Sequence, residues 1–217
     1  LLFFKAREEA QLYEAEGHMD RVKPSIRKTA KTITLLYLAF LVLGIFEYRI
    51  VGMSLLDSCI HAMCSLSTGG FSSRASSIGA YNSLGVEIIT SQLMILGTFD
   101  FSLLLTLFSG RIRDFFHSTE IKTFFSLLLT LSGIMALILI AKGYGFSSTF
   151  RVTLFNALSA LSTTGFSTLD YRTLPEEAIF ILIMLMIVGG GMGSTAGGIK
   201  LERFNIIFKS TLKSIRE

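Results

Sequence analysis

Two nearly identical phrases carry the residue types in this sequence that suit the binding of a cation. They are "SLSTGGFSS" at 65–73 and "ALSTTGFST" at 160–168. Glycine permits backbone angles that other residues rarely adopt, so such a phrase can turn several carbonyl oxygens toward one axis. Carbonyl oxygens arranged in this way replace the hydration shell of a cation in a selectivity filter. The two phrases therefore predict two parts of one ion-binding site.

The duplication of the phrase distinguishes it from an ordinary turn, which is the more common context for a single "STGG". Under a constant shift of 95 residues, Gly70 matches Gly165. The same shift aligns His61 with Asn156. Each phrase ends a stretch that is too short and too polar to cross a membrane, and each lies between two long apolar runs. The sequence is therefore an internal duplication whose unit is a span, a half-helix, a glycine loop and a second span.

The composition indicates that the elements holding these phrases lie in a membrane. Apolar residues make up 51% of the 217 residues and charged residues 17%, and the mean hydropathy is +0.60, which is too hydrophobic for an ordinary soluble domain. About 20 residues cross a bilayer. Four runs approach that length, at 33–46 with its flanks, 84–108, 123–141 and 178–200. We predict an all-α membrane protein in which two half-helices re-enter between these spans.

The positive charges give the orientation of the chain. The sequence contains 20 Lys and Arg residues, and most of them fall in three connectors, at 1–31, 109–122 and 200–217. The exceptions are Arg49, Arg74, Lys142, Arg151 and Arg172. Cytoplasmic loops accumulate Lys and Arg, so we place the three connectors in the cytoplasm and expect the half-helices to enter from outside. This explains the net charge of +4 without a nucleic-acid partner.

These patterns divide the sequence into five segments. We expect cytoplasmic connector helices at 1–31, a pore repeat at 32–110, a cytoplasmic linker at 111–122, a second pore repeat at 123–209 and a cytoplasmic tail at 210–217.

The residues of the two phrases have distinct expected roles. Their backbone carbonyls would face the ion, their small hydroxyl side chains would lie beside its path, and Phe71 and Phe166 would pack behind the loops. The C-terminal ends of the half-helices would direct negative dipole ends toward the cation. The predicted filter residues are Ser67, Thr68, Gly69, Gly70, Phe71, Ser162, Thr163, Thr164, Gly165 and Phe166.

The fourth apolar run dissolves into "GGGMGSTAGG" at 189–198. Gly191, Gly193 and Ala196 fit a dinucleotide-binding fingerprint, but the following strand and acidic residue of that motif are not evident. Glycine disfavours helix, so we expect a loop at membrane depth just below the filter. The alternative is that these glycines only allow close helix packing. The predicted loop residues are Gly189, Gly190, Gly191, Gly193, Ser194, Thr195, Gly197 and Gly198.

Together these features resemble the Trk/Ktr/HKT superfamily of potassium transporters, and most closely its bacterial TrkH-type membrane subunit. "STGGFSSRASSIGAYNS" and "STTGFSTLDY" resemble the second and third filter loops of that family, and "GGGMGSTAGGIK" resembles its intramembrane gate loop. The stretch "LYEAEGHMDRVKPSIRKTAKT" resembles the linker before the second repeat. The resemblance covers almost the whole sequence.

The resemblance implies a potassium-conducting subunit of a bacterial plasma membrane, gated by the glycine-rich loop and containing no organic cofactor. Four repeats would surround one pore, so these two imply either an excerpt of a longer polypeptide, which we favour, or a chain that dimerises to complete the pore. In plant members a serine at one filter position accompanies sodium selectivity, so glycine in both loops implies potassium. The implied partners are a cytosolic nucleotide-binding ring of the RCK/KTN type and a second copy of the full-length subunit. The implied K⁺ ligands are Thr68, Gly69, Gly70, Thr163, Thr164 and Gly165.

Three further questions stay open at the level of sequence. The re-entrant loops could serve structure or bind a small molecule in a protein that conducts no ion, which is the alternative to transport. Asp100 lies inside the second apolar run, and an intramembrane acid is a functional candidate by default. We expect it either to line the inner cavity or to pair with a neighbouring repeat. Six acids on the outer half would either form a cation-attracting ring or be solvated individually. They are Glu47, Asp57, Glu87, Asp170, Glu176 and Glu177.

Overall fold

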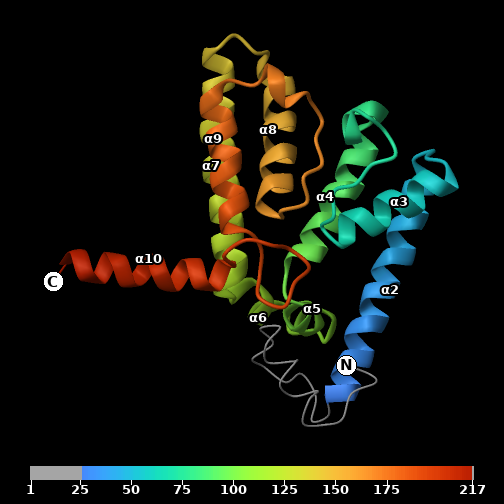
Figure 1. Cartoon of the computed structure of the whole chain (residues 1–217). Coiled ribbons are helices and arrows are strands. Elements are labelled where there is room, and N and C mark those ends of the chain that lie inside the picture. Colours follow the sequence, from blue (N-terminus) through green and yellow to red (C-terminus); the bar gives the residue numbers. More distant parts are fainter. Residues whose placement is uncertain (1–25, 217) are drawn as a thin grey trace.

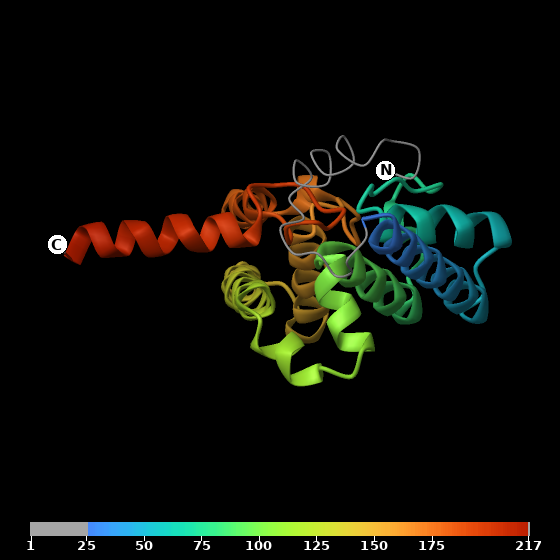
Figure 2. The same cartoon turned by 90° about the horizontal axis from the view of Figure 1, so that it is seen from below.

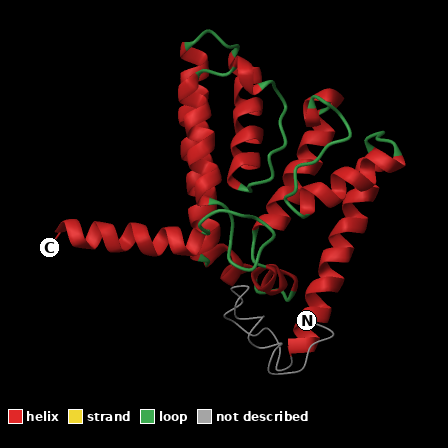
Figure 3. Cartoon of the chain, in the orientation of Figure 1, coloured by secondary structure: helices red, strands yellow, loops and turns green. Residues whose placement is uncertain are grey.

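The structure, a computed structural model, describes residues 26–216. These residues form helices, short 3₁₀ turns and connecting loops, and no strand occurs among them (Figure 3). The prediction of an all-α protein is therefore confirmed.

The first repeat is built around a short helix that lies between two longer ones. Its helices are α2 (Ile26–Ile50), α3 (Leu55–Leu66), α4 (Leu84–Thr98) and α5 (Phe101–Phe108). Ser54 caps the start of α3 by accepting a hydrogen bond from the N–H of Asp57 at 3.1 Å, a common way to satisfy a free helix N-terminus. α3 contacts both α2 and α4 (Figure 1). It is the first of the two predicted half-helices.

The second repeat has the same order of elements. Its helices are α7 (Thr119–Ala141), α8 (Phe146–Leu161) and α9 (Glu176–Val188). The half-helix α8 contacts both α7 and α9 (Figure 1). A short 3₁₀ turn follows each glycine phrase, at Ser77–Tyr81 in the first repeat and at Tyr171–Thr173 in the second.

Two further helices lie on the side that the charge pattern assigns to the cytoplasm. α6 (Ile112–His117) links the repeats, and α10 (Leu201–Arg216) follows the glycine-rich loop. α10 extends away from the other helices in both views (Figures 1 and 2). Near its start, the hydroxyl of Thr123 on α7 donates a hydrogen bond to Asn205 at 3.0 Å.

The long helices have the length and surface of membrane spans. Thr29–Ile50 and Thr119–Ala141 have mean hydropathies of 1.9 and 2.5, and only 17% and 33% of their most apolar windows are buried within the protein. Apolar side chains such as Leu35, Val42 and Leu137 point outward, which is stable where lipid rather than water is the solvent. The chain is therefore a multi-pass membrane protein, as predicted.

The second span differs from its prediction as one continuous helix at 84–108. The helix breaks between Thr98 and Phe101, and α4 and α5 meet at an angle of 109°. Phe99 adopts an extended conformation, and Asp100 then caps α5 by accepting a hydrogen bond from the N–H of Ser102 at 2.6 Å. Hydropathy does not respond to such a break, because the residues on both sides of it are apolar.

Three predicted segment boundaries fall inside helices, and one of them, between 122 and 123, lies within α7. The expected connector at 1–31 lies mostly outside the described residues, and its described part, from Ile26, belongs to the long helix α2. The boundary between 209 and 210 lies within α10, which continues to Arg216.

The two repeats pack together mainly through α4 and α8. At the outer end of this contact, Arg151 on α8 donates two hydrogen bonds to the buried carboxylate of Glu87 on α4, at 2.6 and 2.7 Å. Apolar side chains from both repeats, including Leu93, Leu161 and Phe166, fill the common core beneath it. This packing fixes the ends of α3 and α8, and with them the two glycine phrases, close to each other.

Candidate ion-binding site

The two glycine phrases have the same backbone path. Ser67 and Ser162 follow the last residues of α3 and α8 with φ angles of −79° and −72°. The next residues, Thr68 and Thr163, adopt the left-handed region, with φ of 51° and 55°. Gly70 and Gly165 do so as well, with φ of 68° and 88°. The two loops are thus matched in conformation as well as in sequence.

The same hydrogen bonds close both half-helices. The N–H groups of Gly69 and Gly70 donate to the carbonyl of Cys64, at 2.8 and 3.3 Å. In the second repeat, the N–H groups of Thr164 and Gly165 donate to the carbonyl of Ser159, at 3.0 and 3.4 Å. These bonds satisfy the amides of each loop and hold it against the end of its helix.

The carbonyl groups of the loops are in the opposite situation. No hydrogen bond within residues 26–216 ends on a carbonyl oxygen at loop positions 68–70 or 163–165. Buried or membrane-embedded backbone carbonyls are nearly always paired. Six such oxygens, three from each matched loop, are therefore available to a ligand that accepts electron pairs. They belong to Thr68, Gly69, Gly70, Thr163, Thr164 and Gly165.

The loops touch each other at Gly70. A Cβ atom at Gly70 would overlap the carbonyl oxygen of Thr164 in the other loop. The equivalent position beside Gly165 is open, with no atom of this chain within 4 Å of a Cβ placed there. Glycine is thus required at 70 both by its φ angle and by the close approach of the second loop, and at 165 by its φ angle.

The two phenylalanines differ in their surroundings. Phe166 is fully buried and stacks on His61 of the first repeat, with ring centroids 5.9 Å apart and planes at 21°. Phe71 is 77% exposed. The expectation that both rings pack behind their loops therefore holds for Phe166, while Phe71 lies outside the packing made by residues 26–216. The reason is that the ring of Phe166 packs on the preceding repeat, and no preceding repeat is described for Phe71.

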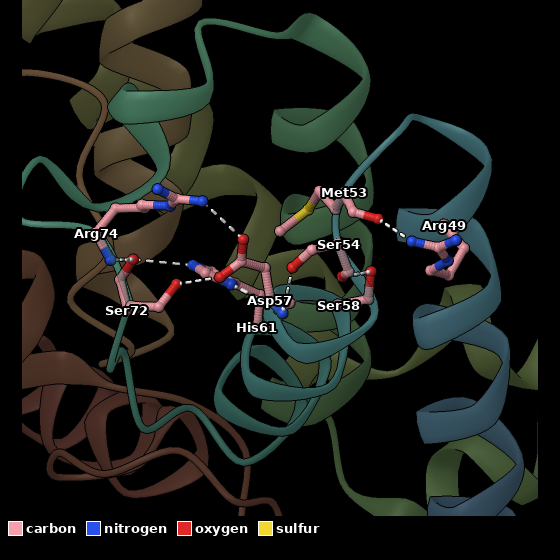
Figure 4. Close-up of polar contacts among 9 residues, drawn as sticks. Arg49, Met53, Ser54, Asp57, Ser58, His61, Ser72 and Arg74 are labelled. Carbon is pink, nitrogen blue, oxygen red and sulfur yellow. Dashed lines mark hydrogen bonds and ion pairs between the residues drawn. The ribbon is translucent and has the colours of Figure 1, made fainter.

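A polar network at the outer end of α3 holds the first loop as it leaves the site (Figure 4). His61 bridges its own helix and the loop, through Nδ1 to the carbonyl of Asp57 at 2.8 Å and Nε2 to the hydroxyl of Ser72 at 2.9 Å. Asp57 accepts hydrogen bonds from Ser73 at 2.5 Å and Arg74 at 2.9 Å. The bond from Ser73 and the guanidinium of Arg74 lower the pKa of Asp57 to about 2.

The second repeat makes the corresponding brace without a titratable group. Asn156, which matches His61 under the shift of 95 residues, donates through Nδ2 to the carbonyl of Val152 at 2.8 Å and to the hydroxyl of Thr168 at 2.9 Å. In both repeats, therefore, one buried side chain connects a carbonyl of the half-helix to a hydroxyl at the exit of its loop.

The glycine-rich loop lies directly against both phrases on their inner side. The hydroxyl of Thr68 donates to the carbonyl of Thr195 at 2.9 Å, and the N–H of Gly197 donates to the hydroxyl of Thr163 at 2.6 Å. Helix α9 ends at Val188, and residues 189–200 form a loop before α10 begins. A loop in this place is what the glycine content predicts.

The loop closes on itself at its two ends. The N–H of Gly190 donates to the carbonyl of Gly197 at 3.3 Å, and the N–H of Lys200 donates to the carbonyl of Val188 at 3.0 Å. Gly189 and Gly198, with φ of 74° and 83°, approach so closely that a Cβ on either would overlap backbone atoms of the opposite side. Ser194 donates to the carbonyl of Gly191 at 2.6 Å.

A buried acid next to this loop was missed by sequence reasoning. Glu120, at the start of α7, is 4% exposed and accepts a hydrogen bond from the N–H of Asp100 at 3.2 Å. A Cβ at Gly191 would overlap its carboxylate, so Glu120 packs on the glycine-rich loop. It lies in the stretch at 111–122 that the sequence assigns to an exposed linker, and its only signal was its place next to an apolar run.

Four of the six acids expected on the outer half have side-chain partners among the described residues. Glu87 is buried against Arg151, and Asp57 is buried against Arg74. Glu47 accepts hydrogen bonds from Gln92, and Glu177 pairs with Lys142 at 3.2 Å. Asp57 and Glu87 are therefore not solvated as separate surface charges, because each is paired with an arginine.

Comparisons with known proteins agree with this geometry. The family model of the TrkH cation transport proteins matches residues 4–159 and 142–217. The chain is 32% identical over 206 residues to an uncharacterized cation transporter, MJ1485, of Methanocaldococcus jannaschii, covering 95% of this chain and 41% of the relative. It is 31% identical over 214 residues to the Trk system potassium uptake protein TrkG of Escherichia coli, covering 96% and 44%.

The fold is also found in a solved structure. The crystal structure of the potassium transporter TrkH from Vibrio parahaemolyticus superposes with a TM-score of 0.86 at 23% identity, covering 96% of this chain and 45% of that chain. The chain thus spans less than half the length of the relatives it matches.

Proposed function

This chain belongs to the TrkH family of cation transport proteins, and from that premise we propose that it forms part of the ion-conducting subunit of a potassium uptake system. Relatives named as Trk system potassium uptake proteins support the choice of potassium. The proposed ligands are the backbone carbonyls of the two matched loops. The ion is the transported substrate, and the proposal requires no organic cofactor.

The observation that carries the proposal is the set of six carbonyl oxygens without a protein partner among the described residues. Three come from Thr68, Gly69 and Gly70, and three from the matched positions of the second loop. Loop amides bonded back to the half-helices leave the carbonyls as the groups that face a ligand. A dehydrated cation is the ligand that a ring of carbonyl oxygens binds.

The half-helices support the same charge preference. α3 and α8 both end at the loops, so their C-terminal dipole ends lie next to the six carbonyls. A helix C-terminus carries about half a negative elementary charge and stabilises a nearby cation. The contact between Gly70 and the carbonyl of Thr164 holds the two loops at a fixed separation, and rigid spacing of ligands is what allows one cation to be preferred over another.

The glycine-rich loop is suited to act as the gate. It lies on the inner side of both filter loops and is hydrogen-bonded to each of them. Its backbone is not helical, so it can change position without unwinding a span. Closed on itself by the bonds between its two ends, it would block the path of an ion leaving the filter toward the cytoplasm.

The complete protein is proposed to contain more than these two repeats. The chain spans less than half the length of its relatives, and two loops supply only part of a ring of ligands. We infer four repeats around one pore in a bacterial plasma membrane. The proposed partners are a cytosolic nucleotide-binding ring of the RCK/KTN type and a second copy of the full-length subunit.

Uptake of Rb⁺ by cells that lack other potassium uptake systems, and that express the complete gene product, tests the proposal. We expect uptake by the wild type, competed by K⁺ far better than by Na⁺. The Gly165→Ser variant is expected to lose about tenfold or more of this discrimination, because the new side chain disturbs the spacing of the carbonyls.

A matched control separates this effect from backbone strain. Gly143 has a φ of 92° and, like Gly165, has no atom within 4 Å of an added Cβ, but it lies far from the loops. Gly143→Ser is expected to transport as the wild type does. Normal rate and selectivity in Gly165→Ser would reject the filter, and a well-folded wild type that moves no Rb⁺ would favour a non-conducting protein with structural re-entrant loops.

A further inference from the structure

Three threonines from three different segments meet between the filter loops and the glycine-rich loop. Thr68 and Thr163 occupy matched positions in the two filter loops, and Thr195 lies in the glycine-rich loop. Thr68 donates its hydroxyl proton toward the carbonyl of Thr195 at 2.9 Å. The hydroxyl of Thr163 accepts from the N–H of Gly197, two residues further along the same loop, at 2.6 Å. Both filter loops are thus bound to one short stretch.

The hydroxyl of Thr195 makes contacts of its own. It lies 2.9 Å from the carbonyl oxygen of Leu66, the last residue of α3, and 2.8 Å from that of Gly97, just before the break between α4 and α5. The N–H of Thr195 also donates to Gly97, at 3.0 Å. A Cβ at Gly97 would overlap the carbonyl of Leu66, so this junction depends on glycine there. Thr195 therefore joins the half-helix, the broken span and the glycine-rich loop.

The backbone at Thr68 and Thr163 points to a constraint that is maintained by these contacts. Both residues have positive φ, which is rare for a β-branched residue and costs free energy. A strained conformation persists only where its surroundings hold it. At both positions the surroundings include a hydrogen bond between the threonine hydroxyl and the glycine-rich loop.

Movement of the glycine-rich loop would break these bonds. If the loop left the ion path, Thr163 would lose its partner at Gly197, and the carbonyl of Leu66 would lose the hydroxyl of Thr195. The hydroxyl of Thr68 would keep only its bond to the carbonyl of Ser67, at 2.7 Å. Polar groups at membrane depth need replacement partners, so the filter loops would have to rearrange or take up water. The position of the loop and the shape of the filter are thus linked.

We propose that Thr195 is a positioning residue that ties the closed glycine-rich loop to the first filter loop and to the end of its half-helix, so that gating and ion selectivity are coupled. The proposal rests on the proposed function, since it takes 67–71 and 162–166 as the filter and 189–198 as the gate. Thr195 does not contact the ion. It acts through the end of α3 at Leu66 and through Thr68.

The test compares Thr195→Val, which removes the hydroxyl but keeps the shape, with Thr195→Ser, which keeps the hydroxyl. The matched control is Thr130→Val, because the hydroxyl of Thr130 donates only within its own helix, to Ser126 at 2.7 Å and Leu127 at 3.3 Å. All variants are made in the complete protein. Rb⁺ flux without activating stimulus, competition by Na⁺, and hydrogen–deuterium exchange of the loop amides are measured.

For Thr195→Val we expect about fivefold to tenfold more unstimulated flux, the effect of losing one buried hydrogen bond, together with weaker discrimination against Na⁺. Amides at 68–71 should exchange faster, and those at 163–166, whose loop is bonded by the N–H of Gly197, should change less. Thr195→Ser should restore all three readouts.

Three outcomes would overturn the coupling. The first is that Thr195→Val matches Thr130→Val in flux, selectivity and exchange. The second is that it alters flux but leaves selectivity and loop exchange unchanged. The third is that it behaves identically to Thr195→Ser. The exchange measurement does not require transport. If the wild type moves no Rb⁺ but the loop amides of Thr195→Val exchange faster than those of the wild type, the proposed function is rejected while the positioning role of Thr195 is supported.

Discussion

Gly70 and Gly165 occupy the same position in their loops but differ in what surrounds them. Both have positive φ, so any other residue is strained at either place. Only Gly70 also faces the backbone of the other loop, through the carbonyl of Thr164. The two glycines should therefore respond differently to the smallest substitution.

Gly70→Ala is expected to unfold at a clearly lower temperature than Gly165→Ala and to abolish Rb⁺ flux. Left-handed backbone costs alanine about 1–2 kcal/mol at either position, and overlap with a backbone oxygen adds about 1–3 kcal/mol at Gly70. Thermal unfolding of the purified variants measures the difference. Gly143→Ala, with φ of 92° and open surroundings, gives the cost of φ alone. Equal stability of the Gly70 and Gly143 variants would contradict the close packing of the loops.

Asp57 should make stability depend on pH at the acid end. Ser73 and Arg74 lower its pKa to about 2, below its ordinary value of about 4. A depressed folded-state pKa gives stabilisation that is complete above about pH 4 and is lost as the pH falls toward 2. The unfolding temperature of the wild type should therefore fall more between pH 5 and pH 3 than that of Asp57→Asn. Parallel curves for the two proteins would show that this pair contributes nothing.

The sequence alone located the two matched glycine loops but not all of their surroundings. The shift of 95 residues aligns Gly70 with Gly165, because both loops need a glycine where the backbone adopts a positive φ. Glu120 escaped notice, since an acid at the edge of an apolar run looks like an interfacial charge until the chain folds over it. The exposure of Phe71 also could not be predicted, because it depends on which repeat lies next to it.

In the glycine-rich loop, the glycines allow two backbone segments to approach each other too closely for a side chain. Gly189 and Gly198 lie back to back, so each excludes a side chain on the other. The contacts to the filter loops come from Thr195 and from Gly197, which also takes part in the closed ends. Substitution at the closed ends should therefore affect the gate more than the filter, whereas removal of the Thr195 hydroxyl should affect both gate and filter.

Gly198→Ala is expected to raise unstimulated Rb⁺ flux with a smaller change in the K⁺/Na⁺ ratio than Thr195→Val, because the bonds of Thr195 are not removed by this substitution. The added methyl group overlaps the backbone of Gly189 and Val188, which costs about 1–3 kcal/mol and forces the closed ends apart. Gly110→Ala is the control, because Gly110 has a similar φ of 81° but open surroundings. An altered ion ratio with unchanged unstimulated flux would count against a gate at this loop.

At the level of elements, hydropathy and glycine content were sufficient for the order of spans, half-helices and loops. They could not predict that α4 and α5 meet at 109°, because a break between two apolar helices leaves the hydropathy of the run unchanged. Asp100 was the available signal. It was interpreted as an intramembrane functional acid, and the structure places it as the N-cap of α5.

The contact between the two repeats joins different surfaces of the two units, so it is of the head-to-tail type. The first repeat contributes Gly70 and His61, and the second contributes the carbonyl of Thr164 and the ring of Phe166. The equivalent surfaces that form no such contact within the described residues are the open space at Gly165 and the exposed ring of Phe71. Contacts of this head-to-tail type build a ring when the rotation between units closes. The proposed four-repeat pore follows from repetition of this one contact.

The most direct test of the central claim is to locate the bound ion. Crystals of the complete protein grown with Rb⁺ in place of K⁺ would report its position by anomalous scattering. We predict peaks beside the carbonyl oxygens of residues 68–70 and 163–165 that persist in an excess of Na⁺ and weaken when K⁺ is added. Rb⁺ bound elsewhere in the protein, with no peak at either loop, would contradict the assignment of these loops as a potassium filter.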